Sequence, residues 1–96
     1  MQYAVLDLCC VRVAVVRVER AHLIEPAATK KLCELQRRFG ILPILLVAFS
    51  DPALKDVQGF SHFPTAPYVE ELVQWNLLEP VAWAPLPPLL EPEGPF

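Results

Sequence analysis

The chain has 96 residues, of which 54% are hydrophobic, and a formal net charge of −3. This length suffices for one domain whose core needs neither metal nor disulfide, and the apolar excess indicates a filled core or a buried subunit interface. The longest apolar run, residues 41–49, is too short for a membrane helix, which needs about 20 residues. We therefore expect a soluble, cytoplasmic protein with no membrane partner.

Charge is divided unequally along the chain. All eight Lys and Arg lie in residues 1–55, which balance at +3, whereas residues 56–96 contain six acids and no base. This polarity predicts two complementary surfaces, which meet either within one chain or between chains. In a two-fold dimer the basic part of one copy would then face the acidic part of the other.

The sequence begins with two expected strands, residues 3–8 and 11–18, which are rich in Val, Leu and Ala. The adjacent Cys9 and Cys10 between them form either a hairpin turn or a bulge. A two-residue hairpin needs positive φ, which Cys adopts poorly. A further short strand is expected over residues 22–25.

The clearest pattern is an amphipathic helix from Pro26 to Phe39. Its apolar residues recur at offsets of 0, 4, 7 and 11, and Gly40 is placed to end it: Ala28, Leu32, Leu35, Phe39. Residues 41–49 follow as a buried central strand.

Beyond Ser50, the segment 53–63 fits either a helical turn or a short strand near Gly59. A second helix is expected over residues 66–74, with Thr65 as its cap and Pro67 in its first turn. Residues 77–84 fit a final edge strand, because Pro80 excludes them from the centre of a sheet.

These elements predict an α/β fold, a small two-layer sandwich in which a mixed sheet of four to five strands carries two helices on one face. Residues 1–84 form the single domain, and residues 85–96 form a proline-rich, extended tail. Eleven prolines and an excess of Arg over Lys, five to three, suit a GC-rich or thermophilic source.

Catalytic and metal-binding signatures are missing from the sequence. The cysteines lack the paired spacing of a zinc site, and we interpret Cys9, Cys10 and Cys33 as buried structural thiols. The three glycines are far apart, which excludes a phosphate-binding loop. We therefore predict no catalytic residue, no metal and no cofactor.

One segment, residues 35–47, resembles the helix-to-strand segment of restriction-type nucleases, including archaeal Holliday-junction resolvases. The resemblance implies an Asp and a Glu-x-Lys on the preceding strands, but here the matching strand, residues 13–17, has no carboxylate before Arg17. It leaves a degenerate, nuclease-like nucleic-acid binder as one alternative, using a basic helix face: Lys30, Lys31, Arg37, Arg38. The sequence pI near 5.2 argues against nucleic acid as the partner.

The preferred function is a non-catalytic protein–protein interaction or assembly domain that forms a homo-oligomer. Aromatic and apolar residues of the acidic half are its candidate interface, since Trp and Tyr are enriched in interfaces: Phe60, Phe63, Tyr68, Trp75, Trp83, Leu89, Phe96. The alternative is an acidic inhibitor or nucleic-acid mimic that binds a basic protein partner through residues 56–96.

Overall fold

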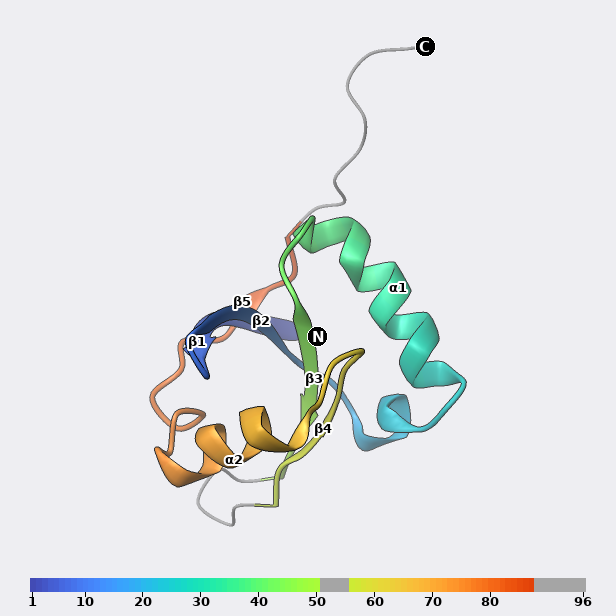
Figure 1. Ribbon diagram of the computed structural model, residues 1–96. Coiled ribbons are helices and arrows are strands. Elements are labelled where there is room, and N and C mark those ends of the chain that lie inside the picture. The colour runs from blue at the N-terminus through green and yellow to red at the C-terminus, as the bar shows by residue number, and fades with distance from the viewer. Residues whose placement is uncertain (51–55, 88–96) are drawn as a thin grey trace.

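The computed structural model describes residues 1–50 and 56–87 (Figure 1). Within these residues five strands form one sheet of order β4-β3-β2-β1-β5, in which β2 and β3 are parallel and the other neighbours antiparallel. The predicted fold class, a small α/β domain with a mixed sheet and two helices, is confirmed. In chain order the elements are β1 (Gln2–Leu8), β2 (Val11–Arg17), the 3₁₀ helix η1 (Arg20–Leu23), α1 (Ala27–Phe39), β3 (Ile44–Ala48), β4 (Gln58–Phe60), α2 (Ala66–Gln74) and β5 (Ala84–Pro85).

The link between β1 and β2 is a two-residue hairpin turn. Leu8 pairs with Val11, which leaves Cys9 and Cys10 as the turn, with φ of 49° and 64°. Both thiols are exposed, as is Cys33 on α1, so the interpretation of buried thiols is wrong. Cys9 and Cys10 form the tip of the hairpin, and Cys33 lies outside the buried stripe of α1.

Helix α1 connects the two parallel strands. It ends where predicted, at Gly40, whose φ of 67° suits glycine. Its N-terminus begins at Ala27, and the N–H of Thr29 is satisfied by the carboxylate of Glu25 at 2.8 Å. The strand expected over residues 22–25 is replaced by η1, because the chain must turn here from the end of β2 towards α1.

The two helices cover opposite faces of the sheet, which corrects the predicted placement on one face. On the α1 side, Leu32 and Leu35 pack with alternate residues of β2 and β3, among them Val16 and Leu46. On the α2 side, Leu72 packs with the intervening residues of the same strands. The physical reason lies in β3, whose five residues are all buried, so both of its faces need a cover.

The segment between β3 and α2 contains β4, a three-residue edge strand centred on Gly59. This agrees with the strand alternative for residues 53–63, although residues 51–55 lie outside the described ranges. Helix α2 has the predicted bounds. The hydroxyl of Thr65 does not cap it, because it bonds to the Ser61 hydroxyl at 2.8 Å and to the Phe63 carbonyl at 3.3 Å.

After α2 the chain passes around the β1 edge of the sheet. Trp83 packs on the α2 side, 6.2 Å from the Phe49 ring, and β5 then pairs with the start of β1. Leu86 packs on the α1 side, and the carbonyl of Pro87 accepts a hydrogen bond of 2.8 Å from Arg38. Strand pairing is thus limited to Ala84–Pro85. Of the edge strand expected over residues 77–84, Ala84 alone pairs, and residues 77–83 form turns and irregular structure.

Candidate functional site

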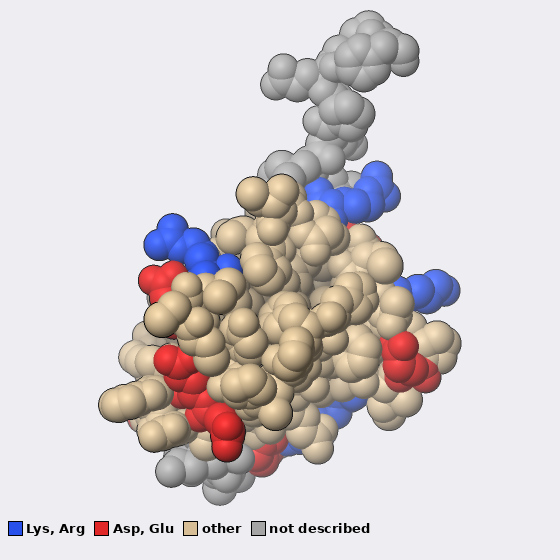
Figure 2. All heavy atoms as spheres, in the orientation of Figure 1, with Lys and Arg blue, Asp and Glu red and all other residues tan. Residues whose placement is uncertain are grey.

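Two hollows adjoin the segment that leads from β4 into α2. One, of about 470 Å³, lies on the outer flank of α2 and the other, of about 80 Å³, lies between α1, β3 and this segment. We call their lining the β4 face: Leu32, Gln36, Pro43, Ile44, His62, Phe63, Ala66, Val69, Glu70, Val73, Gln74. Glu70 is the one residue of this set that is charged at neutral pH. Figure 2 shows the same side of the molecule as a broad area without Lys, Arg, Asp or Glu, with charged side chains at its borders and acidic ones over α2.

The outer edge of β4 borders this face with free backbone groups. The N–H of Val18 donates to the Val47 carbonyl at 2.9 Å, so Val47 points towards β2. Because neighbouring residues of a strand point in opposite directions, Leu46 and Ala48 bond to β4, and Gly59, opposite Val47, directs its N–H and C=O outwards. The β4 face therefore contains both apolar side chains and one exposed strand edge.

The predicted basic residues of α1 differ in their surroundings. Lys30 and Arg37 are exposed, and no ion pair joins either of them to another described residue. Lys31 lies 3.6 Å from Glu34, and the half-buried Arg38 is bonded to Pro87. The four residues therefore do not act as one free basic patch; Lys30 and Arg37 remain available for a partner.

The predicted aromatic interface is divided between core and surface. Phe63 and Tyr68 are half-buried and form an edge-to-face pair with ring centroids 4.8 Å apart, and Phe63 also lines the β4 face. Phe60 and Trp83 are half-buried against the two core clusters. Trp75, at the end of α2, is 66% exposed. The other two predicted residues, Leu89 and Phe96, lie outside the described residues.

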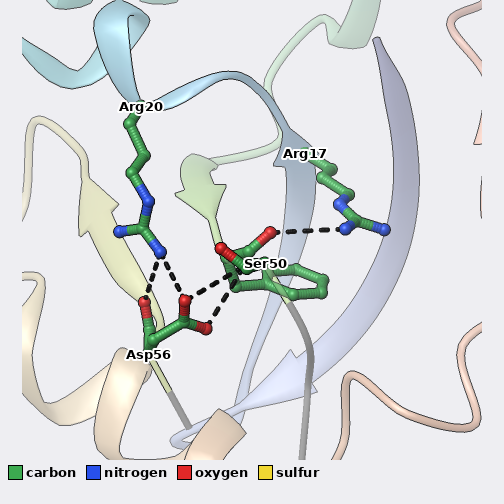
Figure 3. A network of polar contacts seen from close by, with 5 residues as sticks. Arg17, Arg20, Ser50 and Asp56 are labelled. Atoms are coloured by element: carbon green, nitrogen blue, oxygen red, sulfur yellow. Dashed lines mark hydrogen bonds and ion pairs between the residues drawn. The ribbon is translucent and has the colours of Figure 1, made fainter. Parts of the chain in front are cut away.

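A polar network joins the carboxyl ends of β2 and β3 (Figure 3). Arg20 donates to the Asp56 carboxylate at 2.6 Å, and the same carboxylate accepts the N–H of Ser50 at 3.2 Å. The Arg17 guanidinium lies 4.0 Å from the centre of the Phe49 ring and bonds to the Phe49 carbonyl at 3.3 Å. Each charged group of this network has a partner within it, so the network ties the two strand ends together.

A further hollow of about 450 Å³ lies beside this network. Its lining joins the first residues of the chain to the end of β2 and to η1: Met1, Gln2, Arg17, Val18, Glu19, His22. The Nδ1 atom of His22 is buried without a hydrogen-bond partner. No nucleophile of the described chain lines this hollow beside that histidine, so its composition does not match an acyl-transfer or phosphoryl-transfer site.

The Cys9 thiol does not have the environment of a reactive cysteine. The Cys9 N–H donates to the Glu71 carboxylate at 2.5 Å. Side-chain hydrogen bonding with Glu71 is the main cause that raises the pKa of the Cys9 thiol, with loss of solvent and the Glu71 charge adding to it. Within residues 1–50 and 56–87, no three His, Cys, Asp or Glu side chains come together as metal ligands. The absence of a catalytic residue and of a cofactor remains a prediction.

Sequence reasoning did not identify most of the β4 face. Val69, Val73 and the buried Leu72 lie on one side of α2, and Ala66 extends that side, three residues before Val69 and seven before Val73. The width of this apolar stripe was the available signal, because Leu72 is buried whereas Ala66 is exposed. The α1 side of the face, including Gln36, depends on long-range packing and had no local signal.

Comparisons of this chain with protein-family models, with curated proteins and with solved structures find no match. Among the described residues, neither helix has the length and apolarity needed to cross a membrane.

Proposed function

We propose that this protein is a non-catalytic interaction domain that assembles into a homo-oligomer through the β4 face. The observation that carries the proposal is the area between α1 and α2, where a single residue among eleven is charged (Figure 2). Charged residues are depleted at the centres of interfaces and gather at their rims. The apolar hollow over Val69 and Val73 would be filled by side chains of a second copy.

The acidic-mimic alternative has less support, because three of the carboxylates it needs have partners within the chain. Asp56 bonds to Arg20, Glu71 bonds to the Cys9 N–H, and Glu79 bonds to Asn76. Of the acids in residues 56–87, Glu70 is the one for which no partner is found. A mimic of nucleic acid needs several free carboxylates on one surface to match a basic groove.

The test is the solution mass measured by light scattering across a micromolar concentration series. We expect the wild-type chain to approach twice its monomer mass as concentration rises. Ala66→Asp places a carboxylate in the lining of the α2 hollow of the β4 face, and it should fold because an acid is favourable in the first turn of a helix. This variant is expected to stay monomeric.

The matched control is Ala82→Asp, the same substitution at an exposed residue beside the opposite edge of the sheet. It is expected to assemble like the wild type. A wild-type chain that is monomeric throughout the series overturns the proposal, and so does an Ala66→Asp variant that assembles normally.

A further inference from the structure

We infer that two copies meet with α1 of each against α2 of the other, around a two-fold axis that runs along β4. This inference rests on the proposed function and adds the arrangement of the two copies. It follows from the positions of α1 and α2 on opposite faces of the sheet, with the β4 edge between them (Figure 1).

Two symmetric arrangements would bring two β4 faces together. A two-fold axis normal to the sheet leaves each helix on its own side, so α1 meets α1 and α2 meets α2, and the two β4 edges can join into one continuous sheet. A two-fold axis along β4 exchanges the sides, so each α1 meets the other copy's α2. The charges on the helices and the length of β4 decide between the two.

The helix charges favour the second arrangement. Helix α1 contains four bases and one acid, and α2 contains two acids and no base. Glu70 lines the β4 face on α2, and Arg37 is exposed on α1 next to Gln36 of that face, each without an ion-pair partner among the described residues. An axis along β4 sets these opposite charges against each other twice, whereas an axis normal to the sheet opposes like charges twice.

The short β4 edge can contribute few backbone hydrogen bonds to a continuous sheet. β4 has three residues, and Gly59 is the one among them whose N–H and C=O point outwards. Short edge strands are a common means of preventing edge-to-edge pairing. Packing of apolar side chains around Val69 is therefore the larger contribution, and that packing is compatible with the crossed arrangement of helices.

The experiment compares dimer dissociation constants, by light scattering or sedimentation, for three charge variants. Glu70→Arg puts bases on both helices and should weaken the dimer about tenfold, since two symmetric contacts change from attraction to repulsion. The same substitution reduces the magnitude of the net charge from −3 to −1. That reduction by itself would favour association, because two copies of the chain would repel each other less. Arg37→Glu should weaken the dimer similarly.

The deciding variant combines Glu70→Arg with Arg37→Glu, which exchanges the signs and keeps the net charge at −3. We expect it to recover most of the wild-type affinity. If the wild type dimerises and Ala66→Asp prevents it, but Glu70→Arg does not weaken the dimer or the double variant fails to recover, the crossed arrangement is wrong while the proposed function stands. A wild type that never dimerises overturns both.

Discussion

The side chain of Val69 on α2 rests directly on the backbone of Gly59 in β4. A Cβ atom at position 59 would lie 2.7 Å from Val69 Cγ2 and 3.0 Å from Thr65 Cγ2. Real Cβ contacts are essentially never as short as 2.7 Å, so a side chain at this position requires Val69 or the helix that carries it to shift. Glycine at position 59 thus allows α2 to lie this close to β4.

Gly59→Ala is therefore expected to destabilise the fold by about 1–3 kcal/mol, the usual cost of overpacking. The measurement is urea unfolding of the variant and of the wild type. Introducing the same alanine into a Val69→Ala background should cost less, because the closest opposing atom is gone. Equal costs in both backgrounds would show that Val69 is not what opposes the new methyl group.

The hairpin turn predicts a stabilising change. Cys9 and Cys10 both have left-handed φ, which costs a residue with a side chain about 1–2 kcal/mol relative to a right-handed one. Asn-Gly is the sequence that this turn prefers. The double variant Cys9→Asn/Cys10→Gly keeps the backbone N–H that bonds to Glu71. We expect its free energy of unfolding to exceed that of the wild type by about 1–2 kcal/mol.

The control for the turn is Cys33→Ser, which replaces an exposed thiol in the middle of α1, away from any positive-φ position. Its free energy of unfolding should stay within about 0.5 kcal/mol of the wild type. A turn variant no more stable than this control would mean that the cysteines carry no backbone strain.

Two neighbouring arginines on α1 should behave differently. Arg38 donates to the Pro87 carbonyl, whereas the exposed Arg37 makes no polar contact with a described residue. Arg38→Ala should destabilise the fold by about 1 kcal/mol and speed amide hydrogen exchange at Ala84, because β5 loses a tie close to its end. Arg37→Ala, studied at a concentration where the chain is monomeric, should change neither quantity.

Acidification should weaken the contacts of the Asp56 carboxylate with Arg20 and with the Ser50 N–H at the end of β3. Loss of solvent around Asp56 works to raise its pKa, but the hydrogen bonds from Ser50 and the charge of Arg20 outweigh it, so the pKa lies below the ordinary 3.8. A lowered folded-state pKa contributes stability that is present above 3.8 and is lost as the pH falls through the folded-state value.

The measurement is the free energy of unfolding between pH 7 and pH 2. Asp56→Asn should reduce the loss of stability at the acid end and lower the stability at neutral pH. The remaining acid dependence is expected to include Glu25, whose pKa is lowered mainly by the Thr29 hydroxyl and then by its backbone N–H. An acid limb of unchanged slope in Asp56→Asn would contradict the assignment.

Local patterns account for the parts of the fold that were predicted. The stripe from Ala28 to Phe39 with Gly40 after it defined α1, and Thr65 with Pro67 defined the start of α2. The side on which α2 packs was not predictable in the same way. It depends on the path of the chain from Gly59 into the helix. The apolar sequence of β3 indicates that both faces of the sheet are covered, but it does not indicate which helix covers which face.

The candidate site shows the same limit. Trp75 was expected at an interface from its residue type and is exposed, but Tyr68 and Trp83, which are of equally favourable types, pack onto the core. Residue type cannot separate these outcomes, because large aromatic side chains serve cores and interfaces alike. The β4 face instead arises from smaller residues such as Ala66 and Val69, brought beside α1 by the tertiary fold.

The pairing of β5 with Gln2 and Tyr3 has a consequence for biosynthesis. The two strands lie near opposite ends of the described residues, so the outer edge of β1 at Gln2 and Tyr3 can be closed only after Ala84 and Pro85 have left the ribosome. A nascent chain that has completed β1, β2, α1 and β3 would present that edge uncovered while translation continues. Ribosome-bound chains from which residues 84–87 have not yet emerged should therefore be more prone to aggregate than chains, extended by a linker, from which these residues have emerged.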